Sequence, residues 1–161
     1  MKNKIVDIEK LAQRTSELRG SGKKLVATNG CFDLLHLGHV RYLQAARALG
    51  NALVVGVNGD DSARELKGPG RPLNNEKERA EVLAALECVD LVTVFPELRA
   101  TRFIEMATPA VYAKGGDYTP ETLNSEERAT LQKIGAEIRI IPFEKGYSTS
   151  RLVERVRDIA K

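Results

Sequence analysis

Five short apolar runs recur along this chain of 161 residues, with stretches of helical spacing between them. The runs are Leu25–Thr28, Leu53–Val57, Leu91–Phe95, Ala110–Ala113 and Glu137–Ile141. Their apolar residues are consecutive rather than alternating, which is typical of strands covered on both faces in a parallel sheet. Alternation of strands with helices implies right-handed crossovers. The sequence therefore predicts an α/β fold with a Rossmann-like, doubly wound, parallel five-stranded sheet flanked by helices.

Helical patterns occupy both ends of the chain and the stretches between the runs. Apolar residues recur at helical spacing near the start (Ile8, Leu11, Leu18), over Val40–Leu49, after Asn75 (Val82, Leu83, Leu86) and at the end (Leu152, Val153, Val156, Ile159). Asn75, with Glu78 three residues later, indicates a capped helix start. Because the length suits one core, we expect a single domain over residues 1–161, with an N-terminal helical extension (1–22) and an α/β core (23–161).

Composition limits the partners that such a chain can have. Hydrophobic residues make up 42% and charged residues 29% of it, as in soluble globular proteins. No run has the length of a membrane span or the form of a secretion signal, and Cys31 and Cys88 have no metal-ligand spacing. We therefore expect a cytoplasmic protein with reduced thiols and no membrane partner. A net charge of +3, without basic blocks interleaved with aromatic residues, suits small anionic substrates rather than nucleic acid.

The only two histidines, His36 and His39, lie where the first predicted strand gives way to a helix. Free N–H groups and the positive end of the helix dipole meet at such a place, and imidazoles add directed donors toward an anion. This pattern favours a phosphate site. Metal ligation is the alternative, but two imidazoles alone are an incomplete set. We therefore predict no metal-binding residues.

Three other segments lie in loops where ligands of open α/β sheets bind. Lys67–Pro72 carries two cations among glycines and prolines, Lys114–Tyr118 follows the fourth run, and Gly146–Ser150 precedes the last helix. Each also has an ordinary interpretation, as a surface turn, a tight turn and a helix cap. Phosphate binding by the cations, close approach of a flat ligand to Gly115 and Gly116, and a phosphate cradle at the hydroxyls are the functional interpretations.

The absence of three common motifs argues against three classes of enzyme. The chain has no Gly-x-Gly-x-x-Gly after the first run, no P-loop and no Gly-x-Ser-x-Gly elbow, which argues against dinucleotide oxidoreductases, P-loop kinases and serine hydrolases. Attack by a phosphomonoester on a nucleoside triphosphate needs no general base, because the phosphate is already dianionic at neutral pH. It needs alignment and charge stabilisation, which imidazoles, a helix N-terminus, Lys and Arg can supply.

Two signatures carry a family resemblance. Residues 30–39 resemble the His-x-Gly-His signature of the nucleotidyltransferase superfamily that includes the cytidylyltransferases, and Ser148–Ser150 is similar to its second signature. The blocks 28–33, 66–72, 85–90 and 114–118 are similar in order and spacing to the D-glycero-β-D-manno-heptose 1-phosphate adenylyltransferases of lipopolysaccharide-core biosynthesis. Residues 143–150 depart from the Arg-Thr-x-Gly-Ile-Ser-Thr-Thr pattern of glycerol-phosphate cytidylyltransferases.

The resemblance implies roles for individual residues. His36, His39 and Lys67 would be catalytic, with the histidines on the reacting α-phosphate. The residues implied in nucleotide or phosphate binding are Asn29, Gly30, Cys31, Phe32, Asp33, Gly38, Arg71, Lys114, Gly115, Gly116, Asp117, Tyr118, Ser148, Thr149 and Ser150. Gly30 and Phe32 would offer backbone N–H groups, and Asp33 would order the loop or the nucleotide.

The reaction implied by the resemblance is AMP transfer from ATP, with Mg²⁺, to heptose 1-phosphate, giving ADP-heptose and pyrophosphate. A homodimer is also expected, as is a separate heptose kinase and phosphatase in the pathway, because no sugar-kinase domain precedes this one. Two alternatives stay open. One is a cytidylyltransferase that uses CTP and glycerol phosphate or another alcohol phosphate, and the other is a non-catalytic nucleotide-binding module.

Overall fold

Five parallel strands form one sheet in the order β3-β2-β1-β4-β5. The computed structural model describes residues 4–116 and 118–160. The strands are β1 (Leu25–Gly30), β2 (Ala52–Asn58), β3 (Leu91–Phe95), β4 (Val111–Gly115) and β5 (Glu137–Ile141). Each of the five predicted runs is a strand, so the predicted Rossmann-like parallel sheet is confirmed. The order reverses between β1 and β4, which makes the gap between their carboxyl ends the topological switch point.

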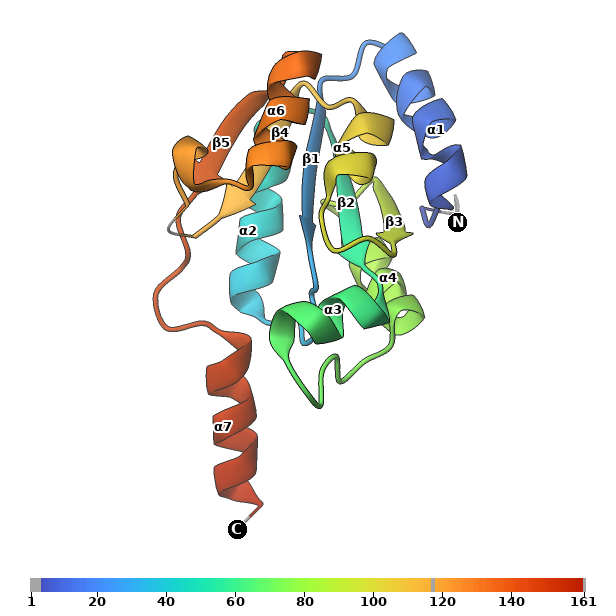
Figure 1. The fold of residues 1–161 in the computed structure, drawn as a ribbon. Helices are drawn as coiled ribbons and strands as arrows, with labels where there is room; N and C mark the ends of the chain where they lie inside the picture. Colours follow the sequence, from blue (N-terminus) through green and yellow to red (C-terminus); the bar gives the residue numbers. More distant parts are fainter. Residues whose placement is uncertain (1–3, 117, 161) are drawn as a thin grey trace.

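The described residues also form seven α-helices and one short 3₁₀ helix, and Figure 1 shows α7 projecting away from the sheet. They are α1 (Ile8–Gly20), α2 (Leu37–Arg47), α3 (Asp60–Lys67), α4 (Glu76–Ala85), α5 (Thr101–Ala107), η1 (Pro120–Thr122), α6 (Ser125–Ile134) and α7 (Thr149–Ile159). The predicted cap of α4 is confirmed, because the Asn75 side chain accepts hydrogen bonds from the backbone of Lys77 and Glu78. No helix within residues 4–116 and 118–160 combines the length and apolarity that crossing a bilayer requires.

Three local predictions differ from the structure. The helix predicted from Val40 begins at Leu37, so His39 lies inside its first turn. Lys67, predicted in a loop, is the last residue of α3, a helix that the sequence pattern missed because its buried residues are only Ser62 and Ala63. Val82, predicted to face the core, is 50% exposed, since it lies on the outer side of α4.

Two apolar clusters cover the two faces of the sheet. Successive residues of β1 point to opposite sides, so Leu25 and Ala27 join one cluster and Val26 the other. The first cluster includes Leu11 of α1, Phe103 of α5 and Leu131 of α6, and the second includes Leu43 of α2 and Leu83 of α4. Because both faces are covered, the central strands carry apolar residues at consecutive positions, as in β2, where every residue is buried. The edge strand β5 instead alternates charged and apolar residues and has none that is fully buried.

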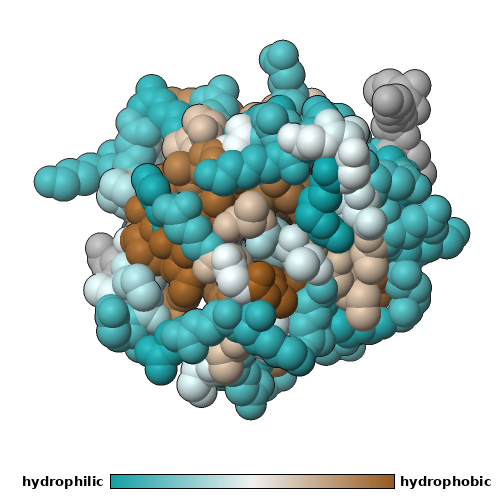
Figure 2. Space-filling model, turned by 90° about the horizontal axis from the view of Figure 1, so that it is seen from above, coloured by the Kyte–Doolittle hydropathy of each residue, from teal (hydrophilic) through white to brown (hydrophobic). Residues whose placement is uncertain are grey.

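The two terminal helices pack differently. Leu11 of α1 is fully buried, and the Arg19 side chain donates a 2.8 Å hydrogen bond to the Ala107 carbonyl at the end of α5. In contrast, α7 has no buried residue, and its apolar Val156 and Ile159 are 60% and 85% exposed. Figure 1 shows α7 extending beyond the carboxyl ends of the strands. Figure 2 views the molecule from the other end, where mostly hydrophilic residues surround smaller apolar areas.

Candidate active site

A cavity of about 750 Å³ opens at the carboxyl ends of β1, β4 and β5 and contains the topological switch point. All four loops selected from the sequence contribute to its lining. The predicted site residues that line it are Asn29, Gly30, Cys31, Phe32, Asp33, Gly38, His36, His39, Lys67, Arg71, Lys114, Gly115, Tyr118, Ser148, Thr149 and Ser150. Gly116 is adjacent to the lining but not part of it, and Asp117 lies outside the described residues.

The two histidines stack on each other at the start of α2. Their ring centroids are 3.9 Å apart with an interplanar angle of 27°, and the edge of Phe32 packs on His39 at 5.6 Å. The His36 backbone N–H donates to His39 Nδ1 at 3.4 Å. An accepting Nδ1 in a neutral imidazole leaves the proton on Nε2. His39 therefore has its Nε2–H available as a directed donor at the N-terminus of α2.

Both imidazoles are held in the neutral form. Burial, followed by the nearby charges of His36 and Lys67, lowers the pKa of His39 to about 4. Burial also lowers the pKa of His36 below its usual value, and His36 Nδ1 is buried without a hydrogen-bond partner among the described residues. An unpartnered buried polar atom is costly. A triphosphate in the cavity would give such atoms a partner and favour their protonated form.

Position 38, between the two histidines in the chain, is a glycine because the structure leaves no room there for a side chain. A Cβ built there would lie 2.9 Å from Tyr147 Cβ and 3.0 Å from the His36 ring. Phe32 is strained in a different way, with a φ of 47° that only a few per cent of non-glycine residues adopt. Its unusual backbone places the ring against His39. These two residues therefore shape the loop so that the imidazoles stack.

Asp33 orders the second loop rather than pointing freely into the cavity. Its carboxylate accepts a 2.7 Å hydrogen bond from Arg71 Nη1 and further ones from the backbone N–H groups of Leu73 (2.7 Å) and Asn74 (3.1 Å). Burial raises the pKa of Asp33, but these donors outweigh it, and the net shift is downward. The ion pair holds Arg71 at the cavity, where its guanidinium lines the wall.

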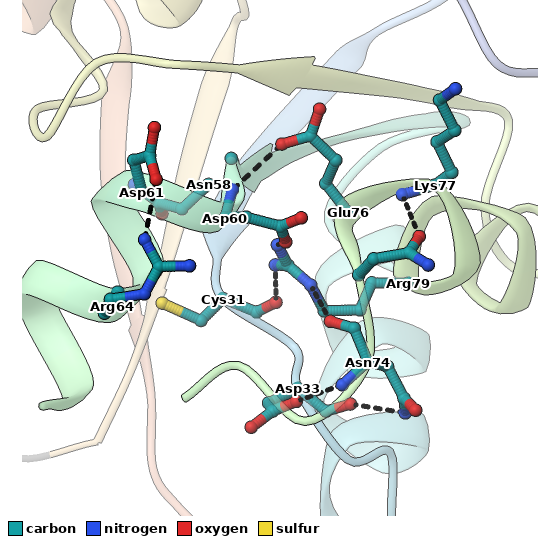
Figure 3. Close-up of polar contacts among 12 residues, drawn as sticks. Cys31, Asp33, Asn58, Asp60, Asp61, Arg64, Asn74, Glu76, Lys77 and Arg79 are labelled. Atoms are coloured by element: carbon teal, nitrogen blue, oxygen red, sulfur yellow. Dashed lines mark hydrogen bonds and ion pairs between the residues drawn. The ribbon is translucent and has the colours of Figure 1, made fainter. Parts of the chain in front are cut away.

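Arg79 of α4 is the largest fully buried side chain among the described residues, and the sequence pattern did not reveal its role. Its guanidinium donates to the carbonyls of Cys31 (2.5 Å) and Asn74 (3.0 Å) and to the Asp60 carboxylate (2.8 Å). Figure 3 shows Arg79 between these three groups, which belong to the loop after β1, the loop before α4 and the first turn of α3. A charged residue at an ordinary helix position gives no local signal of such burial.

Lys67, at the end of α3, and Lys114, in β4, bring positive charge to the cavity. Neither ammonium makes an ion pair with a carboxylate in the part of the chain that the structure describes, and Lys114 lies 5.2 Å from the centre of the Tyr118 ring. Burial lowers the pKa of Lys114. Two such cations, with two imidazoles and the N-terminus of α2, form a surface suited to a polyanion.

The segment between β5 and α7 forms the remaining wall. Phe143 packs on Gly115 and Gly116, Glu144 pairs with Arg41 of α2, and Tyr147 stacks near His36 at 6.4 Å. The Ser148 hydroxyl accepts from the Arg151 N–H, which confirms the predicted cap. The lining residues that were not predicted individually are Arg41, Tyr42, Ala45, Ile141, Pro142, Phe143, Glu144 and Tyr147. Tyr147 lies inside the selected Gly146–Ser150 loop, and Phe143 precedes that loop by three residues.

The donor set does not form a resident metal centre. No group of three or more His, Cys, Asp or Glu side chains with metal-ligand geometry occurs in residues 4–116 and 118–160. Asp33 is already occupied by Arg71 and backbone donors. Mg²⁺ commonly binds through substrate phosphates and one or two carboxylates. The cavity lining therefore fits a Mg²⁺ ion that would enter bound to the nucleotide phosphates.

The fold and the site define a nucleotidyltransferase. Residues 27–155 match the family described as "Cytidylyltransferase-like", and the chain belongs to this family. The family resemblance predicted from the two signatures is thereby confirmed.

Particular relatives are similar over most of this chain. "Bifunctional protein HldE" of Geotalea uraniireducens (strain Rf4) is 49% identical over 154 residues, which cover 96% of this chain and 31% of the relative. The protein of the same name from Syntrophotalea carbinolica is 50% identical over 140 residues, covering 87% of this chain and 28% of the relative. The chain therefore spans about 30% of the length of these curated relatives.

Two solved structures resemble the fold. The crystal structure of the lipopolysaccharide core biosynthesis protein from Thermoplasma volcanium GSS1 is 29% identical, with a TM-score of 0.64, and covers 79% of this chain and 100% of its own. Pantoate-beta-alanine ligase from Francisella tularensis is 14% identical, with a TM-score of 0.62, covering 93% of this chain and 72% of its own. The second likeness concerns the fold alone.

Proposed function

We propose that this chain transfers AMP from ATP to D-glycero-β-D-manno-heptose 1-phosphate, giving ADP-heptose and pyrophosphate for the lipopolysaccharide inner core. The stacked, neutral His36–His39 pair at the N-terminus of α2, facing a cavity with unpaired cations, carries the nucleotidyl-transfer part of the proposal. The sugar and the base are supported by the Lys114–Tyr118 block and by relatives named HldE or assigned to lipopolysaccharide core biosynthesis.

The chemistry follows from charge. A phosphate oxygen of the dianionic sugar phosphate attacks the α-phosphorus of ATP, and the bond from that phosphorus to the bridging oxygen of pyrophosphate breaks. No proton has to be removed from the nucleophile. The Nε2–H of His39, the His36 ring and the N–H groups at the start of α2 stabilise the charge on the α-phosphate. Mg²⁺ bound to the phosphates would neutralise part of the leaving group's charge.

The other site residues have supporting roles in this proposal. Lys67 and Arg71 hold the sugar phosphate or the ATP phosphates, while Asp33 and Arg79 fix the loops that carry them. Asn29, Gly30, Cys31 and Phe32 supply the backbone of the phosphate loop. Gly115, Gly116, Asp117 and Tyr118 border the base and ribose, and Ser148, Thr149 and Ser150 bind phosphate at the start of α7.

The cellular setting belongs to the same proposal. We expect one domain with an N-terminal helical part, a cytoplasmic location and a homodimer, with small molecules as the other partners. A heptose kinase must supply the sugar 1-phosphate, and a phosphatase belongs to the same pathway. These expectations rest on the sequence pattern and the family resemblance.

Pyrophosphate release measured with two nucleotides and two acceptors tests the proposal. ATP with heptose 1-phosphate should give turnover, whereas CTP with glycerol phosphate should not. A preference for CTP would overturn the proposal in favour of a cytidylyltransferase. Tight ATP binding without release of pyrophosphate in the presence of any sugar phosphate would identify a non-catalytic nucleotide-binding module.

A further inference from the structure

A phenylalanine ring lies on a peptide surface that has no side chains. Gly115 ends β4 and Gly116 continues its pairing, with its N–H donating to the Ile141 carbonyl at 3.0 Å. A Cβ on Gly116 would lie 2.7 Å from Phe143 Cζ, and one on Gly115 would lie 3.2 Å from Cε1. Gly116 also has a φ of +94°, which side chains other than hydrogen rarely allow. Both glycines therefore provide a seat for a flat group.

The ring on this seat is not a core residue. Phe143 is 68% exposed and lies at the rim of the same cavity as the histidines. Phenylalanine side chains are among those most often buried in the core of a protein. Here the ring instead covers the end of β4, which neighbours the β1 strand that leads into the histidine loop. Neighbouring strands are about 5 Å apart, so the seat is within one nucleotide's reach of the phosphate end.

The segment that carries the Phe143 ring is held by an ion pair at the surface of the protein. Glu144 pairs with Arg41 of α2, and side chains of this pair are 36% and 50% exposed. Exposed ion pairs contribute little to stability. Outward movement of Phe143 therefore requires only the loss of this exposed ion pair and of the contact of the ring with Gly115 and Gly116, while Tyr147, farther along the segment, packs beside His36.

We propose that Phe143 is the base-stacking residue of the nucleotide site. The nucleobase takes the place of the ring on Gly115 and Gly116, and Phe143 closes over its outer face. This proposal rests on the proposed nucleotidyl transfer, and it adds the residue that positions the base. Stacking of one base on an aromatic ring changes affinity by about 10-fold or more.

Because the chain contains no tryptophan, Phe143→Trp creates a single fluorescent reporter. Titration with ATP should quench this tryptophan as the base stacks on it. Ile159→Trp, at an 85% exposed position near the end of α7, is the matched control and should show no quenching. In parallel, Phe143→Ala should raise the KM for ATP about 10-fold and leave kcat within about 3-fold, while Phe143→Tyr restores the KM.

The outcomes separate the two proposals. If the native protein turns over ATP and Phe143→Trp shows no quenching, the stacking proposal is overturned while the proposed function stands. An unchanged KM in Phe143→Ala would also overturn it. If quenching occurs and the native protein releases no pyrophosphate with any acceptor, stacking is supported and the proposed function fails. Phe143 is exposed, so loss of folding does not confound the variants.

Discussion

The two sides of the cavity are built in different ways. On one side, the side chains of Asp33 and Arg79 make six hydrogen bonds. Asp33 accepts from Arg71 and from the backbone of Leu73 and Asn74. Arg79 donates to the carbonyls of Cys31 and Asn74 and to the Asp60 carboxylate. On the other side, Phe143 and Tyr147 are 68% and 42% exposed and are held by a surface ion pair. Under the proposed function, this difference predicts that the phosphate end, at Asp33 and Arg79, is rigid before substrate binds, whereas the base end, at Phe143, adjusts to it.

Replacing Arg79 should break the buried side. Arg79→Leu leaves the carbonyls of Cys31 and Asn74 and the Asp60 carboxylate without their donor, and we expect a loss of about 3–5 kcal/mol in unfolding free energy. Urea denaturation measures it. Arg64→Leu is the matched control, because Arg64 also pairs with an aspartate of α3 but is 56% exposed, and it should cost no more than about 0.5 kcal/mol. Equal losses would contradict the importance of burial for the contacts of Arg79.

Replacing His39 tests whether the histidine side of the cavity acts in catalysis. His39→Ala should lower kcat for pyrophosphate release by about 10²-fold or more, because a preorganised donor to the α-phosphate is lost. The melting temperature, measured in the same preparation, shows whether the fold persists. Turnover at the native rate in a folded His39→Ala protein would rule out the catalytic assignment.

The buried histidine should also make stability depend on pH. His39 has a pKa of about 4 in the folded protein and 6.5 in the unfolded chain, so the unfolded chain binds more protons between these values. Its contribution is therefore complete above pH 6.5 and is lost as the pH falls toward 4. We expect a loss of about 2 kcal/mol after allowing for partial exposure of the ring.

Unfolding of the native protein and of His39→Asn across this pH range isolates the histidine. Asparagine does not titrate, so the stability difference between the two proteins should shrink as the pH falls. A difference that stays constant from neutral to acidic pH would show that the ring titrates normally in the folded protein.

The smallest effect is expected on the exposed side. Glu144→Ala removes the partner of Arg41 and should change the unfolding free energy by less than about 0.5 kcal/mol, while the KM for ATP rises about 2- to 3-fold. Glu137→Ala, which removes another exposed ion pair on β5, should leave the KM unchanged. A large stability loss in Glu144→Ala would mean that the base side is as rigid as the phosphate side.

Prediction from sequence succeeded where the signal is local. Strands β1 to β4 follow from runs of mostly apolar residues, and the Asn75 cap follows from its spacing to Glu78. The edge strand β5 was also located correctly, but its charged Glu137 and Arg139 alternate with Ile138 and Ile140, so it is not a run of consecutive apolar residues. Prediction failed for α3, which buries too few apolar residues to show a helical period in hydrophobicity. It also failed for Val82, whose side chain is 50% exposed on the outer side of α4. Four candidate loops were recognised because parallel strands place their carboxyl ends together.

The sequence by itself determined the class of fold, the four loops that line the cavity and the His-x-Gly-His signature of the family. Those features depend on residues close together in the chain, whose periodicity and spacing encode local structure. The tertiary structure decided the strand order, the burial of Arg79 and the position of Phe143 on Gly115 and Gly116. Arg79 and Cys31 are 48 positions apart, and only the docking of α4 on β2 and β3 brings the guanidinium to that carbonyl. Long-range contacts of this kind arise when separate elements pack together, and no local pattern specifies them.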